Sequence, residues 1–136
     1  STWHRQPLLT AEIESQVHEI LRRKGNQLGA TIFALNGVED HVHLVSSIPP
    51  SLSVANFVGQ VKGVASAEIN RNHPGGRFAW QAEYGAFSFD ARRLPAHVGY
   101  VERQKEHHRA GTVIQDLEDT ESDPEGGTSS IEKGRG

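Results

Sequence analysis

Residues 30–45 read ATIFALNGVEDHVHLV and contain the clearest strand and turn signals of the chain. Residues 30–35 are apolar and rich in side chains that favour strands, and residues 41–45 again have the pattern of a strand. The Asn36-Gly37 pair between them is a strong turn signal. We therefore predict an antiparallel hairpin that turns at Asn36 and Gly37 and ends before Pro49-Pro50.

Helical periodicity lies on both sides of this hairpin. Before it, apolar residues recur at helical spacing after Thr10, which is suited to cap a helix, until Gly25 supplies a stop. After it, Ser53 can cap a second helix whose apolar face runs to Ile69. The loop at 72–76, rich in Asn, Pro and Gly, closes that helix.

The remaining elements complete an α+β plan. Residues 84–89 read as a strand, Pro95 suits the first turn of a third helix reaching residue 109, and residues 1–5 are expected to end a first strand. The order β-α-β-β-α-β with an appended helix is that of a ferredoxin-like (split βαβ) antiparallel sheet. We expect this domain to span residues 1–115.

Charge is distributed unevenly over the 136 residues. The formal net charge is −3, but from Asp116 onward seven acidic residues face two basic ones, which leaves 10 acidic and 12 basic residues in 1–115. All eight histidines lie in that mildly basic body. The acidic, Gly- and Ser-rich stretch 116–136 has almost no large apolar residue, so we predict a disordered tail there.

Composition excludes several classes of chemistry. Cysteine is absent, which removes disulfides, thiolate catalysis and cysteine-bound zinc or iron–sulfur centres. A metal ion must therefore be held by histidine, carboxylate or amide ligands. No apolar run approaches the roughly 20 residues that cross a bilayer, and no signal peptide is recognisable, so a soluble intracellular protein without a membrane role is expected.

The first group with chemical potential is His41-Val42-His43. In a strand, residues i and i+2 point to the same face, so both imidazoles project together while Val42 and Leu44 face the core. Two convergent imidazoles form half of a metal site, although two polar residues on a solvated face give the same pattern. The group resembles part of the HIT hydrolase pattern, which needs a third histidine where this chain has Val45, so that interpretation is disfavoured.

The second group lies on the third helix. Tyr100, Gln104 and then His107 or His108 follow one another along one stripe. A phenol and an amide one turn apart could place a nucleophile and an oxygen ligand beside one metal ion, whereas packing alone also explains a tyrosine on an amphipathic helix.

A third region, residues 78–88, holds most of the aromatic side chains. Such residues make stacking platforms for unpaired bases, but core packing is the favoured interpretation for Trp80 and Phe87. Basic residues flank these segments and could contact phosphates, or could be solvated surface charges. The candidate DNA contacts are Lys62, Arg71, Arg77, Arg92, Arg93 and Lys105, with Arg103 and Arg109 beside them.

Taken together, these residues resemble the single-tyrosine HUH transposases of bacterial insertion sequences, including their domesticated relatives associated with repetitive extragenic palindromes. The resemblance runs from about Trp3 to His108. Its landmarks, in order, are Asp40-His41-Val42-His43-Leu44, Pro49-Pro50 with Lys62-Gly63, Phe78-Ala79-Trp80-Gln81 with Tyr84-Gly85-Ala86-Phe87-Ser88, and Tyr100-Val101-Glu102-Arg103-Gln104 followed by His107-His108.

This resemblance implies a metal-dependent strand transferase. His41 and His43 match the pair that binds a divalent ion, Gln104 matches the third protein ligand and Tyr100 matches the nucleophile, which forms a 5′-phosphotyrosine. Mg²⁺ is the expected ion, with Mn²⁺ as an effective substitute. The implied substrate is single-stranded DNA with a hairpin near the element end. The implied protein is a bacterial, cytoplasmic, nucleoid-associated homodimer in which one subunit's tyrosine helix can complete its partner's site.

Two departures from the family pattern bear on these expectations. The chain starts only a few residues before Trp3, so part of the first sheet strand is expected to be missing. Glu83 stands where relatives often have glycine, and its carboxylate could neighbour the metal or face outward.

Asp40 could orient a ligand histidine or simply end the hairpin turn.

Two other functions compete with the transferase. One is a domesticated protein that binds hairpin DNA on the same fold without transposition. The other is a zinc hydrolase built on His41 and His43, which would not need Tyr100. The presence of His41, His43, Tyr100 and Gln104 together favours the enzyme, because a protein that only binds DNA has no need of all four.

Overall fold

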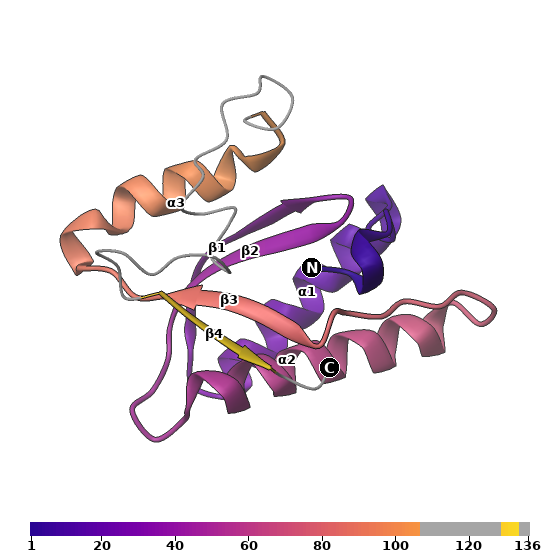
Figure 1. Cartoon of the computed structure of the whole chain (residues 1–136), viewed down its shortest axis with the longest axis horizontal. Coiled ribbons are helices and arrows are strands. Elements are labelled where there is room, and N and C mark those ends of the chain that lie inside the picture. Colours follow the sequence, from indigo (N-terminus) through magenta and orange to yellow (C-terminus); the bar gives the residue numbers. More distant parts are fainter. Residues whose placement is uncertain (107–128, 134–136) are drawn as a thin grey trace.

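The computed structural model describes residues 1–106 and 129–133, in an α+β arrangement of helices around antiparallel strand pairs (Figure 1). In chain order the elements are η1 (Trp3–Arg5), α1 (Ala11–Gln27), β1 (Thr31–Val38), β2 (His41–Ser47), α2 (Val54–Asn72), β3 (Glu83–Phe87), η2 (Ala91–Arg93), α3 (Leu94–Glu102) and β4 (Ser129–Lys133). The predicted fold class, α+β with an appended helix carrying Tyr100, is confirmed.

The two long helices begin where local chemistry predicts. The hydroxyl of Thr10 accepts a hydrogen bond from the backbone N–H of Ile13, and that of Ser53 accepts one from Asn56. Each cap satisfies a backbone donor that the first helical turn leaves without an intrahelical acceptor. Both helices bury one apolar face in a common core, which includes Val17, Ile20 and Leu21 of α1 and Phe57, Val61 and Ile69 of α2.

The β1–β2 hairpin turns later than predicted. Asn36 and Gly37 lie within β1, opposite His43 and Val42, and residues 39–40 make the turn. The physical reason is close packing of the two backbones. A Cβ at Gly37 would lie 2.2 Å from the carbonyl oxygen of His41, so glycine is needed here for close approach. The prediction that Asn36 and Gly37 form the turn is therefore wrong.

The hairpin separates two packing regions. Val42 and Leu44 face the core formed with α1 and α2. On the opposite face, Val45 packs with Ala34 of β1 and with Tyr100 and Val101 of α3. Figure 1 shows the hairpin lying between α3 on one side and α1 with α2 on the other. The sheet therefore carries α3 on the same face as His41 and His43.

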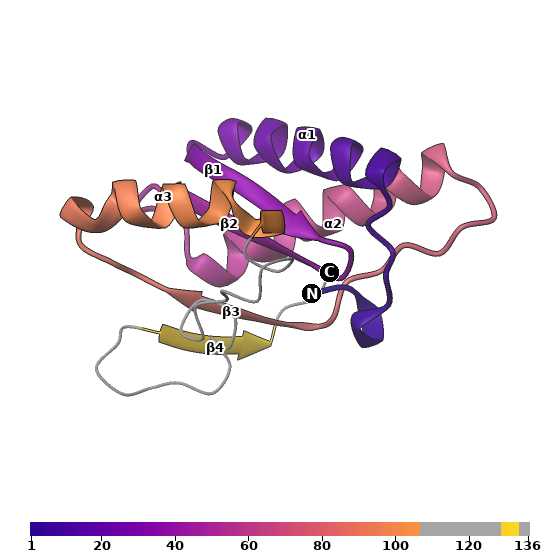
Figure 2. The same cartoon turned by 90° about the horizontal axis from the view of Figure 1, so that it is seen from above.

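The predicted first strand is reduced to one bridge. Thr2 pairs with Trp80 as an isolated antiparallel bridge, and the described strands form two separate pairs, β1–β2 and β3–β4 (Figure 2). Strand pairing stops after Thr2 because the chain turns: His4 and Arg5 have φ values of 51° and 55°, in the left-handed region. The expectation that residues 1–5 are extended is therefore wrong beyond Thr2.

The C-terminal expectations are met in part. The third helix is bounded at Glu102, the chain is helical again over residues 104–106 after a turn at Arg103, and residues 107–109 lie outside the described residues, so the predicted limit at residue 109 stays a prediction. Residues 129–133 form β4, which pairs with β3, so the expectation of disorder across 116–136 is wrong for this segment. The domain limit at residue 115 lies outside the described residues and stays a prediction.

No helix in the described chain is long and apolar enough to cross a membrane.

The aromatic segment divides between the core and the α3 side. Phe78 and Trp80 are buried in the core with their rings edge to face, and the indole N–H of Trp80 donates to the carbonyl of Lys62. Core packing is thus confirmed for Trp80. Phe87 is half-buried and lies beside Phe89 and His97, outside the main core.

Candidate active site

His41 and His43 project from the same face of β2, as their spacing predicts. Their ring centroids are 5.1 Å apart and their planes are nearly perpendicular. His41 is buried and His43 is half-buried. The alternating residues Val42 and Leu44 pack into the opposite core, so the strand itself fixes the direction of both imidazoles.

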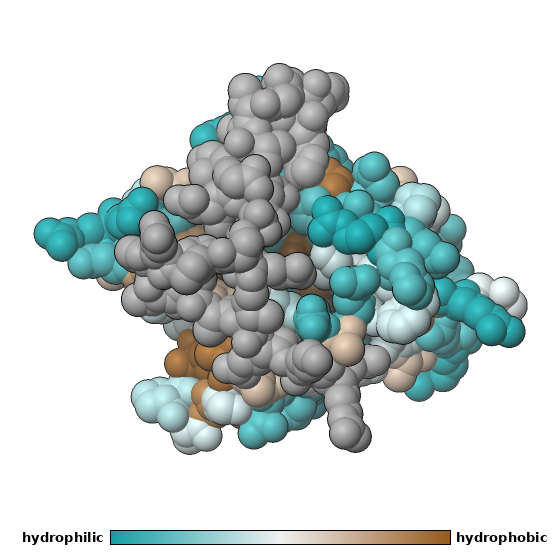
Figure 3. Space-filling model, viewed as in Figure 1, coloured by the Kyte–Doolittle hydropathy of each residue, from teal (hydrophilic) through white to brown (hydrophobic). Residues whose placement is uncertain are grey.

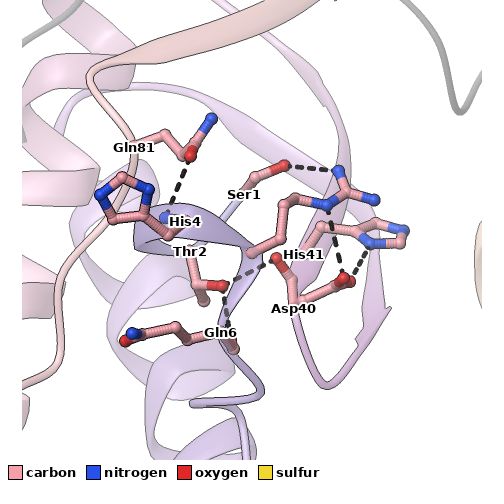
Figure 4. A network of polar contacts seen from close by, with 8 residues as sticks. Ser1, Thr2, His4, Gln6, Asp40, His41 and Gln81 are labelled. Atoms are coloured by element: carbon pink, nitrogen blue, oxygen red, sulfur yellow. Dashed lines mark hydrogen bonds and ion pairs between the residues drawn. The ribbon is translucent and has the colours of Figure 1, made fainter.

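Asp40 holds the ring of His41. Its Oδ1 lies 2.7 Å from Nδ1 of His41, and its Oδ2 lies 3.3 Å from Nε of Arg5. The backbone carbonyl of Asp40 accepts from the N–H of Thr2 at 2.9 Å. The Thr2 hydroxyl lies 2.6 Å from the carbonyl oxygen of Gln6 and 3.1 Å from that of Asp40 (Figure 4). Because an ionised carboxylate can only accept, Nδ1 of His41 carries the proton and Nε2 is the nitrogen with a lone pair for an ion. Asp40 thus both ends the turn and orients His41.

Tyr100 lies next to His43 of its own chain. The two ring centroids are 6.4 Å apart and the planes are inclined by 66°. Pro95 stands in the first turn of α3, as predicted, and five residues later Tyr100 meets the hairpin. The phenol is only 3% exposed and packs with Ala34 and Val45. Helix and hairpin therefore bring the candidate nucleophile to the histidine pair.

Gln104 follows Tyr100 by four residues and is also fully buried. The N–H of Arg103 bonds to the carbonyls of both Gly99 and Tyr100, so the chain stays coiled after α3 and keeps Gln104 on the buried side. The Oε1 atom of Gln104 is shielded from solvent, as is Nε2 of His41. His107 and His108 lie outside the described residues.

A polar clamp fixes the end of α3 over the hairpin. The ammonium of Lys105 donates to a carboxylate oxygen of Glu14 at 2.7 Å, and to Oδ1 of Asn36 and the carbonyl of Gly37 at 2.9 Å each. The side-chain amide of Asn36 donates in turn to the carbonyl of Glu102. These contacts join α3 to α1 and β1, and hold Tyr100 against its own hairpin.

The donor set suits a divalent ion of hard or intermediate character. Two imidazole nitrogens and one amide oxygen are ligand types that Mn²⁺ and Mg²⁺ accept. Within the described residues no group of three or more His, Asp or Glu side chains converges, so Glu83 does not complete a cluster with His41 and His43. The assignment of the Gln104 amide as the third protein ligand stays a prediction.

Comparison with known proteins identifies the family to which the chain belongs. The family model described as "Transposase IS200 like" matches residues 1–104, about three quarters of the chain. The chain belongs to the IS200-like transposase family. The matched range includes His41, His43, Tyr100 and Gln104.

Two relatives of this IS200-like protein come from Deinococcus radiodurans. The ISDra2 transposase TnpA is 28% identical over 71 residues, which cover 52% of this chain and 51% of that protein. The chain thus spans about half the length of that curated relative. The crystal structure of a candidate transposase superposes with a TM-score of 0.61 at 25% identity, over 76% of this chain and 84% of the other.

One predicted DNA contact of the IS200-like protein is corrected by the structure. Lys62 is buried, and its ammonium donates to the carbonyl of Gln81 beneath the segment that precedes β3. Burial lowers the pKa of Lys62 below its ordinary value, because desolvation penalises the charged form. The helical periodicity of α2 alone does not show that this long side chain enters the core. Lys62 is a structural residue and not a surface cation.

The other predicted cations lie on different elements. Arg71 is at the end of α2 and pairs with Glu68, which also pairs with Arg23. Arg92 pairs with Asp90 at the start of η2, and the neighbouring Arg93 is exposed. Arg77 is exposed in the loop before β3. Lys105 is committed to the clamp described above. Their contact with DNA stays a prediction.

Arg5 is a residue near the site that the sequence did not single out. Its guanidinium reaches Asp40 because the backbone at His4 and Arg5 adopts left-handed values, which cost roughly 1–2 kcal/mol per residue. The N–H of His4 donates to the side chain of Gln81, and the N–H of Trp3 to the carbonyl of Ala79. Such long-range anchoring leaves no signal in a local pattern.

Proposed function

We propose that this IS200-like protein cuts and rejoins single-stranded DNA at the ends of a mobile element, with Tyr100 as the nucleophile. The observation that carries the proposal is the approach of the Tyr100 ring to His43, 6.4 Å between centroids, on the face where His41 lies 5.1 Å from His43. A phenol placed beside two imidazoles at the meeting of a helix and a strand suits transfer of a phosphoryl group to tyrosine.

The reaction is an exchange of phosphoester bonds. The phenolic oxygen of Tyr100 attacks the phosphorus, a new bond forms between phosphorus and that oxygen, and the bond from phosphorus to the 3′ oxygen breaks. Overall the phenol loses a proton and the 3′ oxygen gains one. Because one ester replaces another, the strand can later be rejoined to a different 3′ hydroxyl without ATP.

His41, His43 and Gln104 are the residues that would hold the divalent ion, Mg²⁺ with Mn²⁺ as a substitute. When bound, the ion polarises the phosphoryl group and offsets the charge that develops on its oxygens. The protein's own contribution is orientation. Asp40 keeps Nε2 of His41 available, and the strand keeps both rings on one side.

The enclosure of Tyr100 bears on how DNA reaches it. At 3% exposure the phenol cannot contact a phosphodiester from solvent, so cleavage requires a movement that uncovers it. We propose a homodimer as the working form. The contact with His43 of the same chain favours attack within one subunit, whereas attack on DNA at the partner's histidines would require α3 to leave its clamp on Asn36 and Gly37.

The decisive experiment uses a labelled, hairpin-bearing single strand incubated with the protein and Mg²⁺. We expect a covalent protein–DNA adduct that is lost in Tyr100→Phe and kept in Tyr84→Phe, the matched control at the chain's other tyrosine. Hairpin binding without any adduct would support a protein that only binds DNA. Hydrolysis that survives Tyr100→Phe would support a metal hydrolase.

A further inference from the structure

The turn at residues 2–5 has a fixed and unusual geometry. Its two consecutive left-handed residues, His4 and Arg5, are held by hydrogen bonds from Thr2 to Asp40, from Trp3 to Ala79 and from His4 to Gln81. A backbone in a rarely populated conformation persists only where its surroundings impose it, and such places are frequently functional. The proposed mechanism gives this turn no role.

The turn presents an aromatic side chain to solvent. Trp3 is 48% exposed, the most exposed large apolar side chain in the described part of the chain, and its ring contacts His4 edge to face. The chain's other tryptophan, Trp80, is buried and its indole N–H is bonded to Lys62. Packing in the core therefore accounts for a tryptophan at position 80, but it does not account for the exposed tryptophan at position 3.

The same turn presents a positive charge close to the candidate active site. Arg5 is half-exposed, and its contacts with Ser1 and Asp40 use two of the five N–H groups of a guanidinium. The Asp40 carboxylate bridges Arg5 and His41, so one carboxylate separates this guanidinium from a candidate metal ligand. The bridge fixes the cation beside the site and leaves donors for a phosphate.

We propose that Trp3 and Arg5 form a binding subsite for single-stranded DNA next to the candidate active site. The indole stacks on an unpaired base, and the guanidinium binds a phosphate of the same strand. An aromatic ring suits the base of a nucleotide, and a neighbouring guanidinium suits its phosphate. Stacking on an aromatic ring tolerates any base, because every base has a flat π face. The inference rests on the proposed function, because the strand held here is the one that continues to Tyr100.

Tryptophan fluorescence tests the stacking directly. Because Trp80 is buried, a soluble quencher should reach Trp3 first, and Trp3→Phe should remove the accessible emission. We expect a short oligothymidylate, which is unpaired, to quench the emission of the intact protein and to protect it from the soluble quencher. Trp3→Phe should show neither effect. Unchanged emission of the intact protein at saturating oligonucleotide would overturn the stacking contact.

Binding measurements test the contribution of each side chain. By fluorescence anisotropy with a labelled oligothymidylate, Trp3→Ala should weaken binding about tenfold, and Trp3→Phe should retain most of the affinity. Arg5→Ala should weaken binding and lower the slope of log affinity against log salt by about one. Phe33→Ala is the matched control, because Phe33 is also exposed, at 41%, but lies on β1; its affinity should be unchanged.

The outcomes separate this subsite from the proposed function. An adduct at Tyr100 together with unchanged affinity in Trp3→Ala and Arg5→Ala would overturn the subsite and leave the strand transferase standing. Quenching and the expected losses of affinity without any adduct would keep the subsite and remove the transferase. If Trp3→Ala instead changed the oligomeric state in sedimentation while the affinity for DNA stayed the same, Trp3 would contact a second copy of the chain and the subsite would be wrong.

Discussion

Oδ1 of Asp40 lies 2.7 Å from Nδ1 of His41, at the point where the β1–β2 turn passes into the strand that carries both histidines. The carboxylate is also bridged to Arg5, and the backbone carbonyl of Asp40 is bonded to Thr2. The N-terminal segment, the hairpin turn and the His41 ring thus form one connected unit. The direction in which His41 presents Nε2 depends on this unit.

Replacement of Asp40 should weaken metal binding before it affects the fold. We expect Asp40→Ala to lower the affinity for Mn²⁺ by about 10- to 100-fold, because the ring of His41 loses the group that orients it. Asp40→Asn keeps a hydrogen-bond acceptor beside His41 and should therefore lose less affinity for Mn²⁺ than Asp40→Ala. Titration of Mn²⁺ followed by electron paramagnetic resonance measures the free ion directly. Wild-type affinity in Asp40→Ala would show that strand geometry alone orients His41.

Removal of either candidate ligand should separate chemistry from DNA binding. In His41→Ala and His43→Ala we expect cleavage of a hairpin-bearing single strand to disappear, while the affinity for the hairpin stays nearly unchanged, because the ion serves the reaction and not the stem. His73→Ala is the control, since His73 lies at the end of α2 beside Gln16. Parallel loss of binding and cleavage would count against the assignment of these two histidines as metal ligands.

Two glycine substitutions should have opposite effects on stability. Gly37→Ala forces the backbone near His41 to move and should cost about 2 kcal/mol in the free energy of unfolding. Gly63→Ala adds a methyl group within α2 where, apart from the adjacent residues and backbone of the same helix, no atom lies within 4 Å, and should gain about 0.5–1 kcal/mol from helix propensity. Urea unfolding measures both. Equal effects would show that close approach at Gly37 is not what makes glycine necessary there.

Stability should fall as the pH is lowered through the ordinary pKa of histidine. Burial lowers the pKa of His18 below its ordinary value of 6.5, and Nε2 of His18 has no hydrogen-bond partner among the described residues. The unfolded chain therefore binds a proton at a higher pH than the folded chain. The contribution of neutral, buried His18 to stability is fully present above about pH 6.5. It is lost progressively as the pH falls toward the lowered pKa that His18 has in the folded chain.

The matching variant is His18→Gln, which removes this titration. Urea unfolding between about pH 8 and about pH 5 should show a smaller loss of stability in His18→Gln than in the parent chain. His97, whose pKa is also lowered by burial and by Arg93, contributes with the same sign, so part of the loss should remain. An identical pH profile in the two proteins would show that His18 is not a source of the dependence.

Local patterns gave the helices and the orientation of the metal-ligand candidates. The caps at Thr10 and Ser53 and the apolar periodicity of both helices depend on neighbours within one or two turns, so the sequence shows them directly. The common direction of His41 and His43 follows from the period of two in a strand. The position of the hairpin turn does not follow from the Asn36-Gly37 pair, because such a pair suits a close approach of two backbones as well as a turn.

Local sequence is sufficient to predict the α+β class, both long helices and the placement of two imidazoles on one face of a strand, because these features arise from interactions between residues close along the chain. The approach of Tyr100 to His43, the burial of Lys62 and the contact of Arg5 with Asp40 are visible only in the folded chain. These relationships join residues 19 to 57 positions apart, or depend on which side of a helix faces the core. Packing of whole elements sets them, and no local pattern records how elements pack.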